Sequence, residues 1–153
     1  MRYRTVLVGT DGSDTSLQAV ATAAELAGAM TAQLLVVCAY HPVPAREQAR
    51  MTPGLDDTRF RVTGSEAAQS ALDAGLAAAR ETGASSPEGK LVTGDAVEAL
   101  LSEADSGSPA LIVVGNRGMN RLSRRLLGSV PSDVAYRASC CPPPTTTPRP
   151  RHR

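Results

Sequence analysis

The chain has 153 residues, the size of one domain with a sizeable hydrophobic core. Its formal charge is +1, but without the three arginines of residues 142–153 it has 13 basic and 15 acidic residues, a net charge of −2. A mildly acidic body argues against a general nucleic-acid surface, and no apolar run approaches the roughly 18 residues of a membrane span. Three cysteines do not make a disulfide framework and no signal peptide precedes the first apolar run, so we expect a cytoplasmic protein.

The first element is predicted to be a central strand of a parallel sheet. Residues 5–10 form a β-branched, apolar run without polar alternation, which is typical of a strand buried on both faces. Ser13 is placed to cap the helix that follows. Apolar residues then recur at helical spacing as far as Gly28, where we expect the helix to stop.

A second strand is predicted over residues 33–39, followed by a proline-containing loop to about Val62. Loops of that length are uncommon and often serve as lids or binding loops. A second helix is predicted over residues 65–82. Its small apolar face consists of Ala68, Ala71, Leu72, Gly75, Leu76 and Ala79.

The second half of the chain continues the alternation of strands and helices. A third strand is predicted over residues 90–93, and Asp95 is the expected N-cap of a third helix. A fourth strand covers residues 110–114, and a fourth helix covers residues 130–138 with Ser129 as its cap. This alternation predicts an α/β fold with a doubly wound, Rossmann-like parallel sheet and helices on both faces.

The last segment departs from this pattern. Residues 140–153 contain five prolines at the place where a fifth strand is expected. Proline cannot donate to a strand ladder, so this segment cannot be a central strand. We therefore expect residues 1–139 to form the folded domain and residues 140–153 to be an extended or disordered tail rich in Pro, Thr and Arg.

A glycine-rich segment after the fourth strand is a candidate ligand site. Gly115 and Gly118 are followed, after nine intervening residues, by Gly128 and Ser129 at the head of the last helix. Glycines let the backbone approach a ligand closely, and a helix N-terminus attracts anions, so the segment predicts a phosphate cradle. It is neither a Walker A loop nor a Rossmann glycine fingerprint. Alternatively, the glycines simply turn a long surface loop.

Asp11 is the candidate that completes this site. It follows the first strand, and ligands of open α/β sheets bind at the carboxyl ends of the strands. A carboxylate beside phosphates would repel them, so its expected role is to accept hydrogen bonds from a ribose hydroxyl or a base amine. Alternatively, Asp11 merely forms an Asx-turn or caps the first helix.

Three stretches together resemble the universal stress protein family. They are residues 8–13 (VGTDGS), the G-x2-G-x9-G-S frame and residues 127–130 (LGSV), and the match covers about residues 3–139. The chain is most similar to small single-domain actinobacterial members. The resemblance implies a homodimer, a role in stress-response signalling and a sheet in the order 3-2-1-4-5. In this chain the tail replaces the usual fifth strand, so the expected order is 3-2-1-4. A shifted reading frame or a genuine extension would each account for the tail.

The complete glycine motif implies the nucleotide-binding branch of that family. Its usual ligand is ATP with Mg²⁺ or Mn²⁺, and cyclic AMP is the alternative. The metal would be held through the phosphates, so no metal site built by the protein alone is expected, and no catalytic residue is assigned. The implied nucleotide-binding residues are Gly9, Thr10, Asp11, Ala39, Val114, Gly115, Asn116, Arg117, Gly118, Gly128, Ser129 and Val130.

Two functions are compatible with this site. The first is a regulatory module that holds an adenine nucleotide, and the second is a weak ATPase or phosphotransferase. The sequence shows no Ser-His-Asp arrangement and no lysine near the glycine-rich segment, so at most slow ATP hydrolysis is expected.

Overall fold

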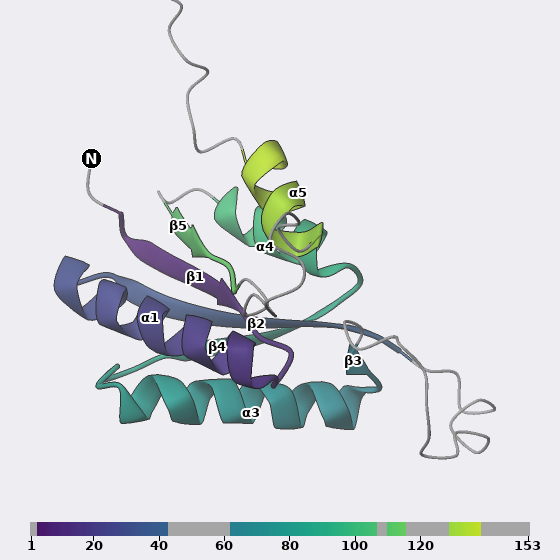
Figure 1. Ribbon diagram of the computed structural model, residues 1–153, viewed down its shortest axis with the longest axis horizontal. Coiled ribbons are helices and arrows are strands. Elements are labelled where there is room, and N and C mark those ends of the chain that lie inside the picture. The colour runs from purple at the N-terminus through teal and green to yellow at the C-terminus, as the bar shows by residue number, and fades with distance from the viewer. Residues whose placement is uncertain (1–2, 43–61, 107–109, 116–128, 139–153) are drawn as a thin grey trace, which may run out of the picture.

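The computed structural model describes residues 3–42, 62–106, 110–115 and 129–138 (Figure 1). Several predictions concern residues outside these ranges. They are the long loop, which covers residues 43–61, the middle of the glycine-rich segment at residues 116–128, and the tail at residues 140–153 together with the domain boundary before it.

The sheet is parallel and is built around β1. Strand β1 (Thr5–Gly9) lies between β2 (Gln33–His41) and β5 (Ala110–Val113). On its other side, β2 pairs with β4 (Glu88–Thr93). The order β4-β2-β1-β5 confirms the predicted order 3-2-1-4. Within the described part of the chain β5 pairs with β1 alone, so β5 is the edge strand there.

A short strand, β3 (Val62–Thr63), lies where the sequence predicted only the end of a loop. It pairs in parallel with Tyr40 and His41, the last two residues of β2. The prediction that β2 ends at residue 39 was therefore too short. The added pairing depends on a strand distant in sequence, which periodicity within either segment does not reveal.

Helix α1 (Asp14–Met30) confirms the predicted start but not the predicted stop. Ser13 is the N-cap, and its hydroxyl accepts a hydrogen bond from the Ser16 amide at 3.3 Å. The helix continues through Gly28. It ends at Thr31, which has φ of 53° and takes the left-handed conformation typical of a helix end. The amide of Ala32 donates to the carbonyl of Ala27 at 2.9 Å, which satisfies a helix-end acceptor.

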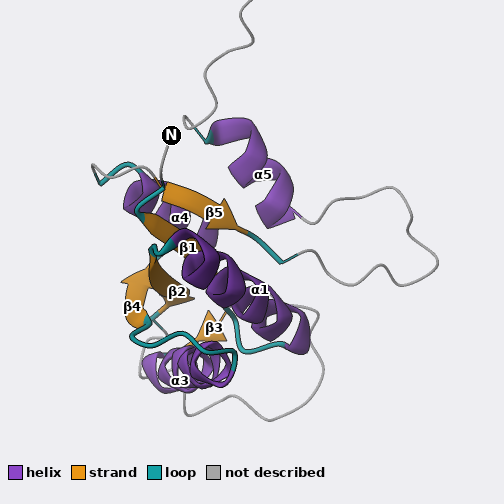
Figure 2. Ribbon diagram, turned by 90° about the vertical axis from the view of Figure 1, so that its left-hand side faces the viewer, coloured by secondary structure: helices purple, strands orange, loops and turns teal. Residues whose placement is uncertain are grey.

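Helices α1 and α3 (Ser65–Glu81) cover one face of the sheet (Figure 2). The α3 face is as predicted, since Ala68, Ala71, Leu72, Gly75 and Ala79 are buried and Leu76 packs against the same cluster. Small side chains let both helices pack closely on the strands. The strand residues of this cluster are Val6, Val8, Leu34, Val36 and Cys38, the last of which is fully buried, as expected for a core cysteine.

Helices α4 (Ala96–Ala104) and α5 (Ser129–Arg137) cover the other face. Asp95 caps α4 as predicted, because its Oδ1 accepts hydrogen bonds from the amides of Val97 and Glu98 at 2.8 and 3.3 Å. The buried residues of this second cluster are Leu7, Val37, Val97, Ala99, Leu100 and Val134. Among the helices in the described ranges, none combines the length and apolar character needed to cross a membrane.

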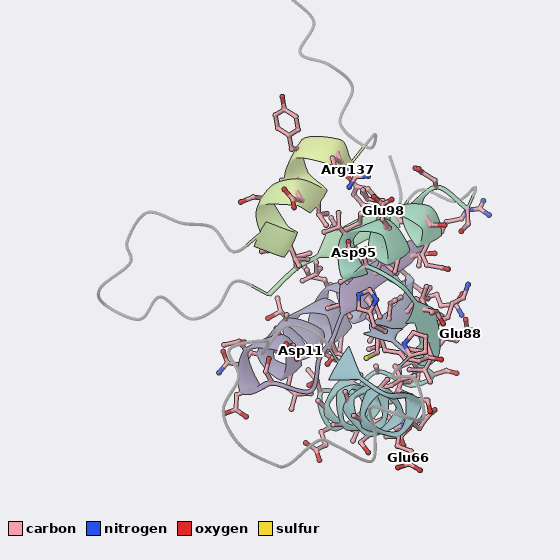
Figure 3. All side chains as sticks on the ribbon, turned by 90° about the vertical axis from the view of Figure 1, so that its right-hand side faces the viewer. Asp11, Glu66, Glu88, Asp95, Glu98 and Arg137 are labelled. Atoms are coloured by element: carbon pink, nitrogen blue, oxygen red, sulfur yellow. The ribbon has the colours of Figure 1, made fainter. Side chains whose placement is uncertain are left out.

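An exposed ion pair joins the two helices of this second layer. Arg137 Nη2 of α5 lies 2.5 Å from Glu98 Oε1 of α4. Both residues are labelled in Figure 3. The hydrogen bond and charge of Glu98 raise the pKa of Arg137 above its usual value. The pair thus links the end of α5 to the first turn of α4 at the surface.

Candidate functional site

The predicted site residues come from elements that end at the same edge of the sheet. In the strand register Gly9 pairs with Val37, and Val8 pairs with Val113. The residues that follow these pairs are therefore neighbours across the carboxyl edge. They are Thr10 and Asp11 after β1, Ala39 near the end of β2, and Val114 and Gly115 after β5.

The turn between β1 and α1 holds Asp11 in a defined conformation. Its Oδ1 accepts hydrogen bonds from the amide and the hydroxyl of Ser13, at 3.0 and 2.5 Å. Gly12 has φ of 79°, a conformation that suits glycine. Asp11 thus forms the Asx-turn that was the local alternative, but a carboxylate offers about four acceptor positions, so Oδ2 can still accept hydrogen bonds from a ligand.

The electrostatics of the turn keep Asp11 ionised. Partial burial raises the pKa of Asp11, but the hydrogen bonds that Asp11 Oδ1 accepts from the Ser13 hydroxyl and amide outweigh this. The net result is a pKa below its usual value. At neutral pH Asp11 is therefore a pure hydrogen-bond acceptor, as recognition of a hydroxyl or an amine requires.

Gly9 and Thr10 face the two opposite helix layers of the sheet, Gly9 toward α4 and Thr10 toward α3. A Cβ at Gly9 would lie 3.4 Å from Leu100 Cδ1, toward α4. Thr10 is buried, and its methyl group lies against Gly75 of α3, where a Cβ would come within 3.2 Å. The side chain of Thr10 is therefore part of the core beneath the turn rather than part of the surface beside Asp11.

An apolar surface lies on the α4 and α5 side of this edge. Ala39, Val114 and Val130 are partly buried, and all three pack against the second core cluster, which contains Leu100 and Val97. All three were predicted as site residues from separate parts of the sequence, and in the structure they pack against the same cluster. A flat apolar group such as a purine base suits a surface of this kind next to a polar acceptor.

Gly115 has a steric reason to be glycine. A Cβ there would lie 3.1 Å from the carbonyl oxygen of Thr15 and 3.2 Å from Ala19 Cβ. The chain leaving β5 therefore passes close over the first turns of α1. This contact places the start of the glycine-rich segment directly beside the Asp11 turn.

The first turn of α5 supplies the last described part of the predicted site. The helix begins at Ser129, one residue earlier than predicted, and Val130 follows it in the first turn. Backbone N–H groups of a first helical turn have no partner within the helix and favour anions. The remaining predicted phosphate residues, Asn116, Arg117, Gly118 and Gly128, lie outside the described residues.

A family model described as "Universal stress protein family" matches residues 2–142, nearly the whole chain. The chain belongs to the universal stress protein family. Universal stress protein Rv1636 from Mycobacterium tuberculosis (strain ATCC 25618 / H37Rv) is 43% identical over 136 residues, covering 89% of this chain and 91% of the relative. The universal stress protein of Thermus aquaticus is 33% identical over 138 residues, covering 90% and 95%.

Solved structures of the universal stress protein family share this fold. The crystal structure of a universal stress protein in complex with cAMP superposes with a TM-score of 0.65. That protein is 36% identical, and the alignment covers 91% of this chain and 93% of the other. The family resemblance and the α/β fold expected from the sequence are thereby confirmed.

Within the described parts of this universal stress protein, no group of three or more His, Cys, Asp or Glu side chains is placed to hold a metal ion. Cys140, Cys141 and His152 lie outside the described residues.

A hollow of about 130 Å³ lies at the opposite, amino-terminal ends of the strands. It is lined by Thr5, Leu7, Gln33, Leu35, Glu88, Glu103, Ser106 and Ala110. None of these is a predicted site residue. The chemistry that the sequence predicted lies at the carboxyl edge instead, so we assign the candidate site there.

Sequence reasoning missed Ser16, which belongs to the Asp11 turn through its side chain. Its Oγ accepts a hydrogen bond from the Asp11 amide at 3.3 Å and lies 3.1 Å from Thr10 Oγ1. One signal was available in the sequence. Ser16 falls on the buried stripe of α1 with Ala19, Val20 and Ala23, where a hydroxyl needs a partner.

Proposed function

We propose that this universal stress protein binds an adenine nucleotide at the carboxyl edge of its sheet and acts as a regulatory module in stress-response signalling. The observation that carries the proposal is that the Asp11 carboxylate, held by Ser13, lies at the same sheet edge as the apolar residues Ala39, Val114 and Val130. Asp11 would accept hydrogen bonds from the ribose or the base, and the apolar surface would contact the base. The first turn of α5 would meet the phosphate.

Cyclic AMP is the ligand that the described charges favour. It carries one negative charge, whereas ATP carries several, and the Asp11 carboxylate lies in the turn of the site. ATP would therefore need Mg²⁺ or Mn²⁺ to reduce the repulsion. The relative in complex with cAMP, 36% identical over nearly the whole chain, supports the same choice.

The binding module comprises residues 1–139, with residues 140–153 as an appended tail. A cytoplasmic location, expected from the cysteine usage, and a homodimer, implied by the family, are part of this proposal. A weak ATPase or phosphotransferase would use the same site, and ATP turnover above background that is lost in Asp11→Ala would favour that alternative.

Calorimetric titration tests the proposal. Purified protein is titrated with cAMP, and separately with ATP in the presence and absence of Mg²⁺. We expect cAMP to bind without added metal and ATP to bind only with it. Absence of binding by either nucleotide, in protein shown to be folded by circular dichroism, would refute the proposed function.

A further inference from the structure

Ser16 is a hydroxyl on the buried face of α1. The residue is only 9% exposed, and it is followed along the same face by the apolar residues Ala19, Val20 and Ala23. Serine is mostly found at the surface, and a buried hydroxyl costs stability unless it is hydrogen bonded. The Ser16 hydroxyl therefore needs hydrogen-bond partners within the protein.

The direction of the hydrogen bonds around Ser16 can be assigned. Its Oγ donates to the carbonyl oxygen of Ser13 at 2.9 Å, which uses its one proton. In the 3.1 Å contact with Thr10 Oγ1 the threonine must then be the donor. Thr10 Oγ1 in turn accepts a hydrogen bond from the Gly12 amide at 3.2 Å.

These bonds form a ring around the turn. The amides of Asp11 and Gly12 are both satisfied by the Thr10–Ser16 hydroxyl pair, and the Ser13 carbonyl is held by the same Ser16 proton. Thr10, Asp11 and Ser13 are thereby bonded directly to Ser16 Oγ, and Gly12 is linked to it through Thr10 Oγ1. The backbone of Asp11 is fixed from beneath, while its carboxylate is fixed by Ser13 on the outer side.

We propose that Ser16 is a positioning residue of the site, because its hydroxyl closes the ring of hydrogen bonds that orients the Asp11 carboxylate toward the ligand. The consequence for ligand affinity rests on the proposed function. The consequence for Asp11 itself does not, because the ring is complete without ligand. Preorganisation of this kind strengthens binding by removing the need to order the turn when the ligand arrives.

The test compares Ser16→Ala with Val20→Ala. Val20 is fully buried one turn further along α1 and makes no bond to the turn, so its variant controls for lost stability. The first measurement is the pKa of Asp11 in ligand-free protein, from the chemical shift of its carboxyl carbon during a pH titration. The second is the dissociation constant for cAMP.

We expect Ser16→Ala to raise the pKa of Asp11 toward its usual value and to weaken cAMP binding by about tenfold, whereas Val20→Ala changes neither. An unchanged Asp11 pKa in Ser16→Ala would overturn the positioning role whatever the affinity. A raised pKa in a protein that binds no nucleotide would support the positioning role and refute the proposed function.

Thr10→Val keeps the inference testable if Ser16→Ala fails to fold. Valine matches the shape of threonine and removes the hydroxyl that links Gly12 to Ser16. We expect the same direction of change in the Asp11 pKa. If Asp11 had its wild-type pKa in folded Thr10→Val, the proposal that the ring of hydrogen bonds orients the carboxylate would be overturned.

Discussion

The amide and the hydroxyl of Ser13 both donate to a single oxygen of Asp11, at 3.0 and 2.5 Å. Ser13 is also the N-cap of α1, since its own hydroxyl accepts from the Ser16 amide. One side chain therefore starts the helix and organises the carboxylate. This coupling links the stability of α1 to the charge of the candidate site.

Because of these bonds, Asp11 should make stability depend on pH. Its pKa in the folded protein lies below the ordinary value of 3.8, so its contribution is fully present above that value and is lost as the pH falls through the folded pKa. We expect wild type to exceed Asp11→Asn in free energy of unfolding at about pH 7, and the difference to shrink below about pH 4. Urea denaturation across this range measures it. A difference that grows on acidification would contradict the assignment.

Loss of the cap should weaken the same helix. Ser13→Ala removes the hydroxyl that receives the Ser16 amide and the shortest donor to Asp11. We expect it to lower the free energy of unfolding by about 1 kcal/mol and to raise the pKa of Asp11. Chemical denaturation and the carboxyl titration report the two effects separately. Unchanged stability would show that the cap hydrogen bond contributes nothing.

Gly115→Ala should destabilise the protein by about 1–3 kcal/mol, since its Cβ would lie 3.1 Å from the Thr15 carbonyl oxygen. Gly28→Ala is the matched control. Gly28 lies in the interior of α1, where a Cβ meets nothing within 4 Å, and alanine there should stabilise by about 0.5–1 kcal/mol. Thermal unfolding of both variants provides the comparison, and a stabilised Gly115→Ala would mean that β5 and α1 lie further apart.

Thr31→Gly should stabilise the end of α1. Thr31 has φ of 53°, a left-handed conformation that strains residues with a Cβ but not glycine. We expect a gain of up to about 1 kcal/mol, reduced by the greater freedom of glycine in the unfolded chain. Thr31→Ala retains the strain and should show no gain in urea denaturation. Equal effects of the two substitutions would exclude backbone strain as the cause.

Local signals predicted the helix starts well. Ser13 and Asp95 are the caps that the sequence indicated, because a capping side chain and its amide targets lie within three residues of one another. The stop at Gly28 was wrong for a related reason. Glycine suits the left-handed end, but the bonds from residues 31 and 32 to residues 28 and 27 fix the actual end at Thr31.

Contacts between distant segments were harder to predict. The pairing of β3 with Tyr40 and His41 joins segments separated by a long loop, so neither segment alone indicates it. The alternation of strands and helices nevertheless predicted a parallel α/β sheet, and the family resemblance implied the strand order that the structure has. The role of Ser16 could not be inferred from the sequence, because it depends on the direction of each hydrogen bond, which only the folded turn reveals.

The most direct test of the central claim is a thermodynamic cycle at Asp11. Dissociation constants for cAMP and its 2′-deoxy analogue are measured with wild type, Asp11→Asn and the neighbouring control Asp14→Asn. We expect Asp11→Asn to weaken cAMP binding by roughly tenfold to a hundredfold and Asp14→Asn to have little effect. We also expect the difference in affinity between cAMP and its 2′-deoxy analogue to shrink in Asp11→Asn, because the carboxylate that would accept a hydrogen bond from the 2′-hydroxyl is no longer present. Undiminished cAMP binding by Asp11→Asn would contradict the account.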